Sequence, residues 1–183
     1  MLETRHGAGT FVTSLAPGLV LDAVSFIVNF HDPRTAIDFL EVRRLLEAEV
    51  AGRAATRISP AEIDELREVN NRIRAIAGKR PIDIERMIGV DRQFHAQIAA
   101  ASGNSALAAL TDMLGGQTAP ARSLRLAVHA STAGSAVAEH DQIVEALAAG
   151  DSERARLRAA VHVLSLEDWV LQELETDNQL GGR

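Results

Sequence analysis

Residues 84–102 read IERMIGVDRQFHAQIAAAS, and this stretch carries the pattern that decides the fold. Taking every third or fourth residue gives one helical face, made of Ile84, Ile88, Asp91, His95, Ile98 and Ser102. Such a face is typical of a helix packed inside a bundle, yet Asp91 and His95 are polar. The two are four residues apart, so their side chains project one turn apart from the same face. Because a buried carboxylate is costly unless it is paired, the stretch predicts a core helix with a polar partner.

Two later stretches show the same departure from an apolar face. The first has the face Ala136, His140, Ile143 and Leu147, and the second has Ala155, Ala159, His162, Leu166 and Trp169. Three imidazoles and one carboxylate suit zinc, nickel, cobalt, manganese or iron. The other interpretation is that each histidine is a core residue bonded to a backbone carbonyl. The spacing leaves both open, because it does not show that the three faces converge.

The composition predicts one soluble helical domain with a short appendage. The chain has 183 residues, 46% of them hydrophobic, with 3% aromatic residues and no tyrosine. The absence of cysteine excludes disulfides and thiolate metal sites. A net charge of −6 gives the chain as a whole no electrostatic footprint for DNA. There is no signal-peptide pattern and no membrane-length apolar run, so we expect a cytoplasmic protein without a membrane partner.

The order of helix signals predicts an all-α antiparallel bundle of six to seven helices. The expected helices cover residues 19–30, 35–57, 60–78, 81–102, 105–130 (bent near Gly115-Gly116 or Pro120), 132–150 and 151–175. Gly7, Gly9 and the β-forming residues 10–13 predict a turn that enters a short strand. The expected divisions are a β segment over 1–14, a linker with a helix over 15–34, the bundle over 35–176 and a frayed tail over 177–183.

Arg43 and the remaining histidines are weaker candidates for a role. Arg43 lies on an apolar face between Leu40 and Val50, where a guanidinium needs an anion. Its partner is Glu47, or an acidic residue on another helix, or the carboxylate of a bound ligand. His129 lies close to Arg122 and Arg125 in the sequence, at a cavity mouth or in solvent. We expect His6 and His31 to have surface positions.

Several of these stretches resemble a known family, the FCD domain, which is the ligand-binding half of the FadR subgroup of GntR-type transcription regulators. Asp91-Arg92-Gln93-Phe94-His95 followed by Ser102-Gly103-Asn104-Ser105-Ala106-Leu107 is similar to its D-x-x-F-H…S-G-N-x-x-L signature. The family's E-H-x-x-I…A…G-D segment has a counterpart in Glu139 to Ile143 with Ala146 and Gly150-Asp151. Its A…H segment corresponds to Ala155 with His162. Its opening R-x-x-L-E helix corresponds to Arg43 to Glu47. The resemblance covers roughly residues 35–175.

The N-terminal residues resemble a second part of the same regulators. Arg5-His6-Gly7-Ala8-Gly9-Thr10-Phe11-Val12 is similar to the G-x-G-T-F-V wing that closes their winged-helix DNA-binding domain. The recognition helix that precedes the wing in that family has no counterpart in this sequence. We therefore expect DNA contact to require the winged-helix domain that this sequence does not contain.

The resemblance implies a metal-dependent sensor of a small organic acid. It implies that Asp91, His95, His140 and His162 hold a divalent metal ion, with zinc expected and nickel, manganese, cobalt or iron as alternatives. Arg43 and Asn104 would line the effector cavity, and Arg122, Arg125 and His129 are further candidates for it. Family members form homodimers in which the effector changes the spacing of the DNA-binding heads.

Two other classes of function compete with the sensor. Three histidines and one aspartate could serve a metal-dependent hydrolase, but the sequence offers no independent general base beside them. The polar residues could also form only a hydrogen-bonded core in a helical interaction module. We expect no enzymatic activity, because a wing segment has no role in a hydrolase.

Overall fold

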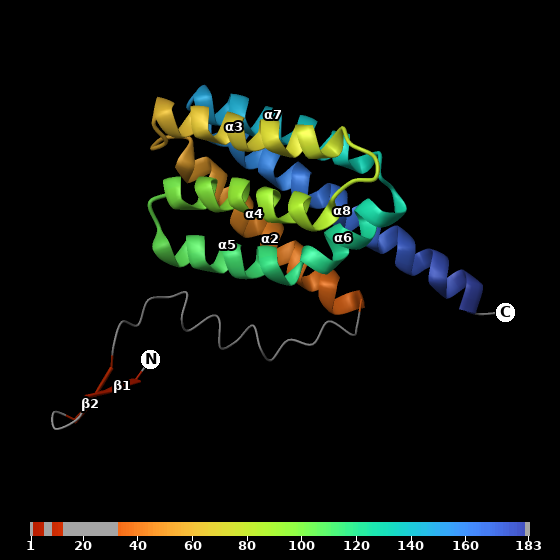
Figure 1. The fold of residues 1–183 in the computed structure, drawn as a ribbon, viewed down its shortest axis with the longest axis horizontal. Helices are drawn as coiled ribbons and strands as arrows, with labels where there is room; N and C mark the ends of the chain where they lie inside the picture. The colour runs from red at the N-terminus through yellow and green to blue at the C-terminus, as the bar shows by residue number, and fades with distance from the viewer. Residues whose placement is uncertain (1, 6–8, 13–32, 182–183) are drawn as a thin grey trace.

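The computed structural model describes residues 2–5, 9–12 and 33–181, and the last of these ranges forms a bundle of helices (Figure 1). Its seven helices are α2 (Pro33–Ala54), α3 (Pro60–Ala77), α4 (Ile84–Ala101), α5 (Ser105–Gln117), α6 (Ala119–Val128), α7 (Thr132–Ala148) and α8 (Ser152–Gly181). The predicted all-α class is confirmed. None of these helices is long and apolar enough to cross a membrane.

The N-terminal segment contains a β-hairpin. Strand β1 (Leu2–Arg5) pairs in antiparallel fashion with β2 (Gly9–Val12), so that Leu2 faces Val12 and Arg5 faces Gly9. The strand expected after Gly9 is confirmed, and β1 was not predicted. The expected helix over 19–30 lies outside the described residues, as do His6 and His31.

The helix ends follow local capping chemistry, which explains one difference from the expected boundaries. Ser59 and Glu62 form a capping box at the start of α3. Helix α4 begins at Ile84 and not at Pro81, because Asp83 is its N-cap and accepts a hydrogen bond from the Arg86 backbone. Gly103, with φ 71°, follows the end of α4 in the left-handed conformation that glycine adopts without strain.

The helix expected over 105–130 is two helices, α5 and α6, separated at Thr118. Pro120 has no backbone N–H, so a continuous helix would lack the bond from this residue to Gly116. Thr118 is buried at the break, where its hydroxyl donates to the Leu114 carbonyl at 2.9 Å. The break changes the chain direction so that α6 covers one end of the bundle (Figure 1).

Helices α2 and α8 form the most extensive helix pair in the bundle and cross its middle (Figure 1). They approach closely at Gly52, where a Cβ atom would lie within 2.6 Å of the Arg156 side chain. Helix α3 packs on α4 and α7, and α5 packs on α2 and α4. Helix α8 continues to Gly181, beyond the expected end near Glu175 and through most of the tail expected to fray. This packing directs α2, α4, α7 and α8 toward one buried centre.

Candidate metal and ligand site

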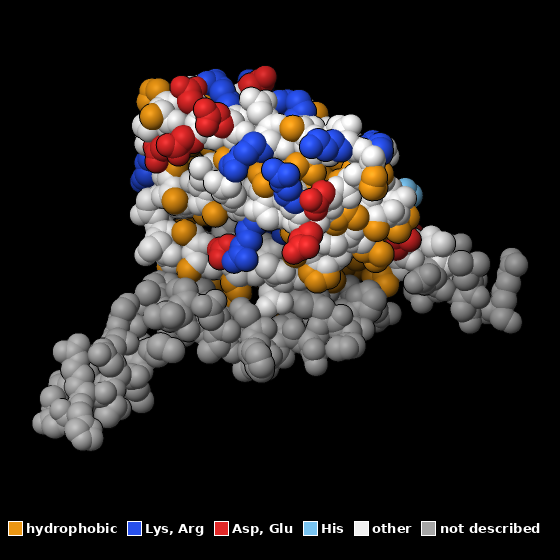
Figure 2. All heavy atoms as spheres, viewed as in Figure 1, with side chains coloured by type: hydrophobic (Ala, Val, Ile, Leu, Met, Phe, Trp, Pro, Cys, Tyr) orange, Lys and Arg blue, Asp and Glu red, His pale blue; other side chains and the backbone are white. Residues whose placement is uncertain are grey.

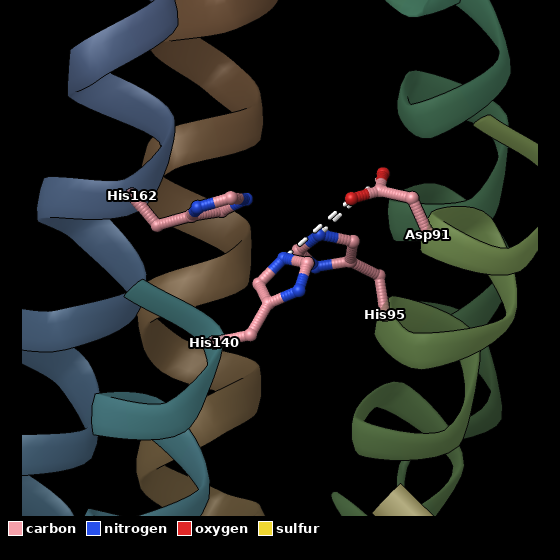
Figure 3. A group of neighbouring side chains, drawn as sticks. All are labelled: Asp91, His95, His140 and His162. Carbon is pink, nitrogen blue, oxygen red and sulfur yellow. Dashed lines mark ion pairs between the residues drawn. The ribbon is translucent and has the colours of Figure 1, made fainter. Parts of the chain in front are cut away.

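Three helices bring the four predicted metal ligands together. Asp91 and His95 come from α4, His140 from α7 and His162 from α8, and their side chains point toward one another (Figure 3). One potential ligand atom from each residue lies within 4.8 Å of the others. Asp91, His95 and His140 are buried, and His162 is 9% exposed. The apolar faces read from the sequence do converge, and the polar residue of each meets the others.

Each histidine of this cluster is held through its Nδ1 atom by an oxygen of another residue. His95 Nδ1 lies 3.0 Å from Glu47 Oε2, and His162 Nδ1 lies 2.7 Å from Glu139 Oε2. His140 Nδ1 lies 3.2 Å from Asn70 Oδ1. Because a carboxylate only accepts hydrogen bonds, the Nδ1 atoms of His95 and His162 donate. An oxygen acceptor on one ring nitrogen is the usual outer partner of a metal-bound histidine.

The other ring nitrogens are left facing the centre of the cluster. The Nε2 atoms of His95 and His140 are buried without a hydrogen-bond partner among the described residues. Asp91 Oδ1 lies 3.5 Å from His140 Nε2, and Asp91 Oδ2 lies 3.9 Å from His95 Nε2, both too long for a hydrogen bond. A proton on Nδ1 leaves Nε2 with a lone pair and no hydrogen, so the Nε2 atoms of His95 and His140 face the centre as unpaired acceptors. A metal cation, which binds such lone pairs, would satisfy these nitrogen atoms.

The surroundings favour the protonation states that metal binding requires. Burial raises the pKa of Asp91, but Arg122 and the nearby imidazoles outweigh it, and the net pKa lies below the usual range. Burial also raises the pKa of Glu47, but Arg43 and His95 bring it well below its usual value. Burial lowers the pKa of His140 well below its ordinary value, and that of His95 to a smaller extent because Glu47 opposes the shift. At neutral pH the carboxylates are therefore ionised and these two imidazoles are neutral.

Arg43 is 2% exposed and is paired within the protein. Its Nε donates to Glu47 Oε1 at 2.6 Å, and its Nη1 donates to Thr118 Oγ1 at 3.1 Å. Of the partners considered from the sequence, the structure shows Glu47. Arg43 also borders a cavity next to the cluster, so its charge acts there although two of its donors are used.

This cavity has a volume of about 60 Å³ and reaches the cluster at Asp91 and His162. That volume accommodates several water molecules or the head group of a small acid. Arg122 and Arg125 of α6 line the cavity, and both retain a buried Nε–H group that has no acceptor in the described structure. Arg122 Nη1 also pairs with Asp91 Oδ2, and Arg125 Nη1 donates to Ser165 Oγ at 3.2 Å. Two unmatched donors beside a candidate cation site favour an anionic ligand.

Two of the predicted effector residues do not line this cavity. Asn104 is the N-cap of α5, and its Oδ1 accepts from the backbone N–H groups of Ala106 and Leu107 at 3.0 and 3.1 Å. His129 follows α6 on the surface, with its side chain 49% exposed and 3.9 Å from Glu173. The capping role explains why an asparagine follows Ser102-Gly103, and it needs no ligand.

Three residues that touch the cluster were not predicted as part of it, namely Glu47, Asn70 and Glu139. Glu47 was expected only as a partner for Arg43, and Glu139 only as part of a motif. A sequence signal existed for Asn70, because it is a polar residue between Leu66 and Ile73 on the apolar face of α3. Which histidine each of them contacts depends on helix packing, for which the sequence carries no local signal.

The fold and the cluster define an all-helical domain with a buried polar centre, and comparison with known proteins identifies its family. Residues 38–165 match the family model described as the FCD domain. This match spans most of the chain, and the chain therefore belongs to the FCD domain family, as the sequence motifs predicted.

The named relatives are transcriptional regulators. The chain is 27% identical over 181 residues to the Exu regulon transcriptional regulator of Escherichia coli K12, covering 96% of this chain and 66% of the relative. It is 27% identical over 150 residues to an HTH-type transcriptional regulator of Streptomyces ambofaciens, covering 81% of this chain and 61% of the relative. The chain thus spans slightly less than two thirds of the length of these curated relatives.

Solved structures agree with this family. Streptococcus agalactiae GntR superposes with a TM-score of 0.66 at 25% identity, covering 91% of this chain and 74% of that one. E. coli McbR/YncC gives a TM-score of 0.66 at 19% identity, covering 94% and 77%, and supports the fold. The curated relatives are named as regulators and not as enzymes, in agreement with the prediction that the chain has no enzymatic activity.

Proposed function

We propose that this chain is the sensor part of a transcription regulator, in which Asp91, His95, His140 and His162 hold a divalent metal ion. The observation that carries the proposal is the orientation of the three imidazoles. Each has its Nδ1 bound to an oxygen, and the Nε2 atoms of His95 and His140 are buried beside Asp91 without a partner. A histidine core without a cation would leave these acceptors unsatisfied. Zinc is the ion we test first, because imidazole and carboxylate ligands suit it.

We further propose that a small carboxylate is the effector and that it binds in the cavity of Arg122 and Arg125. The support is the two unmatched Nε–H donors and the border that the cavity shares with Asp91 and His162. The metal ion would add a second positive charge for the same anion. The effector would then stabilise the conformation of the regulator in which this cavity binds it most tightly.

The readout on DNA is the third part of the proposal. The wing-like residues of β1 and β2 and the regulators named among the relatives support a winged-helix domain as the DNA-binding partner. On the face of the bundle shown in Figure 2, acidic side chains gather at the upper left and basic ones across the middle, with further acidic side chains among them. We therefore assign DNA contact to the winged-helix domain and signal reception to the bundle, in a cytoplasmic protein.

A homodimer is part of this proposal. Its support is a row of exposed apolar side chains on α8, at least 37% exposed, formed by Leu157, Val161, Leu164 and Leu171. Light scattering of the full regulator after size-exclusion chromatography tests the stoichiometry. A monomer at micromolar concentration would contradict this part.

Metal analysis and thermal unfolding test the central claim. We expect the purified protein to hold about one divalent ion, or to gain thermal stability when Zn²⁺ is added after chelation. His162→Ala at the edge of the cluster and His140→Ala at its centre should lose both responses. His129→Ala is the matched control, since His129 is an exposed histidine outside the cluster. A wild-type protein that neither holds nor responds to a divalent ion would refute the proposal.

Citrate provides a probe for the cavity. The zinc-loaded protein should show a rise in melting temperature with citrate, and Arg125→Gln should weaken this response while it leaves the zinc response intact. If citrate, malonate and acetate all leave the zinc-loaded protein unchanged, the proposed effector class is wrong and the metal claim stands.

A further inference from the structure

A chain of polar contacts leads from the surface of the bundle to His140. Arg74 Nη2 lies 2.8 and 2.6 Å from the two carboxylate oxygens of Asp141, at a position where both side chains are about half exposed. Asp141 Oδ1 accepts from Asn70 Nδ2 at 2.7 Å, and Asn70 Oδ1 lies 3.2 Å from His140 Nδ1. Asn70 is 1% exposed and His140 is fully buried. The chain therefore connects solvent-accessible charges on α3 and α7 to the deepest histidine of the cluster.

The contacts of Asn70 determine which way its amide is oriented. Its Nδ2 donates to two acceptors, Asp141 Oδ1 and the Val137 carbonyl at 3.2 Å. A flipped amide would place Oδ1 against both of these acceptors. The network thus requires Oδ1 to face His140, and an oxygen there requires the His140 proton to be on Nδ1.

Asn70 differs from the partners of the other two histidines because it is neutral. His95 and His162 have the carboxylates of Glu47 and Glu139 on Nδ1. An amide provides His140 with an oxygen acceptor but adds no further negative charge at the most buried position. Phe94 stacks on the His140 ring with centroids 4.1 Å apart and planes 19° apart, so the ring is held on its face as well as at its edge.

We infer that Asn70 is a positioning residue for His140: it fixes the proton on Nδ1 and thereby presents the Nε2 lone pair to the cluster. Asp141, itself held by Arg74, keeps the amide of Asn70 in the orientation that does this. The part of the inference that concerns metal affinity rests on the proposed function, whereas the position of the proton does not.

The ring proton is measured in the metal-free protein by NMR of ¹⁵N-labelled histidine. The wild type should show His140 with the proton on Nδ1. Asn70→Leu removes the acceptor and should move a substantial fraction of the proton to Nε2. Glu68→Leu is the control, an exposed residue on the same helix α3 that lies outside the network of Arg74, Asp141 and Asn70, and it should leave the His140 signals unchanged.

Metal affinity gives the second readout. Asn70→Leu should weaken Zn²⁺ binding by about 10- to 100-fold, the usual effect of losing an outer partner of a metal-bound histidine. Asp141→Ala at the surface should weaken binding by a few-fold, and it serves as the variant to measure if Asn70→Leu does not fold.

The outcomes separate the inference from the proposed function. An unchanged His140 proton position together with unchanged Zn²⁺ affinity in Asn70→Leu and Asp141→Ala would overturn the inference and leave the metal site standing. A wild-type protein that binds no divalent ion would refute the proposed function, and the NMR measurement alone then decides whether Asn70 positions His140.

Discussion

The two sides of the histidine cluster differ in how fully their polar groups are matched. On the side of α2 and α3, the buried polar residues Arg43, Glu47 and Asn70 are paired. Arg43 pairs with Glu47 and Thr118, Glu47 also contacts His95, and Asn70 contacts His140. On the side of α6, Arg122 and Arg125 border a cavity and keep unmatched donors. We call the side of α2 and α3 the closed side, because its polar groups are already paired within the protein. We call the side of α6 the open side, because its unmatched donors can bind a ligand. Substitutions should therefore affect mainly stability on the closed side and mainly binding on the open side.

The largest effect is expected at Glu47 on the closed side. Glu47→Ala leaves the buried guanidinium of Arg43 without its carboxylate, which should lower the free energy of unfolding by about 3–5 kcal/mol. Urea unfolding of the metal-free protein measures this. Glu49→Ala is the control on the same helix, because its side chain is 46% exposed and its pair with Arg156 should contribute no more than about 1 kcal/mol. Equal effects of the two changes would contradict the comparison.

Acid should weaken the closed side before it affects the carboxylates. Burial lowers the pKa of His95 and of His140. Below about pH 6.5 these two imidazoles are therefore protonated in the unfolded chain but still neutral in the native state. The free energy of unfolding of the metal-free protein should therefore decrease as the pH is lowered. The decrease should be at most about 1.4 kcal/mol per pH unit for each histidine. Glu47 and Asp91 have lowered pKa values, and their contribution is present above about pH 4.5 and is lost only at lower pH.

Thermal unfolding between pH 7.5 and 5 checks this order. His140→Gln should show a shallower slope than the wild type in the window below pH 6.5. A free energy of unfolding that is constant between pH 7 and 5.5 would show that the two imidazoles are not held neutral in the native state. That result would contradict the assignment of a closed side.

Arg125 tests the open side. Arg125→Gln removes a charged donor from the cavity, so the affinity of the zinc-loaded protein for citrate should fall by about tenfold or more, the value of a hydrogen bond to a charged group. Its side chain is partly exposed, so unfolding should change by less than about 1 kcal/mol. Calorimetric titration measures the first quantity and urea unfolding the second. A large loss of stability with unchanged citrate affinity would reverse the assignment of this side.

The smallest effect is expected for Asn104, which lies on neither side. Asn104→Ala removes the cap of α5 and should cost about 1 kcal/mol of stability, with citrate and zinc affinities unchanged. A loss of citrate affinity in this variant would restore Asn104 to the effector site, where the sequence had put it.

The sequence predicted the all-helical fold, and placed Asp91 and His95 on one helical face, because both depend on local spacing. Asp91 and His95 share a face at any 3.6-residue period, and the capping box at Ser59 fixes a helix start without reference to the rest of the chain. The break at Thr118 was foreseen only as a bend, since proline is tolerated in the first turn of a helix and the sequence does not reveal which turn that is. A motif position does not distinguish a cap from a ligand contact, and the structure shows Asn104 as the cap of α5.

The partners of the histidines could not be predicted for a different reason. Glu47 lies on α2 and its histidine on α4, and Asn70 and His140 are 70 residues apart. Their contacts depend on the rotation and height of two packed helices, which no single helix encodes. The sequence thus showed which groups need partners but not which partners they have.

The depth of the cluster has a consequence for the order of events. The cavity reaches Asp91 and His162, whereas the free nitrogens of His95 and His140 lie behind them. Under the proposed function, an ion enters and leaves through the space that the effector later fills. The ion then binds first and departs last, and its residence time lengthens with every increase in effector concentration.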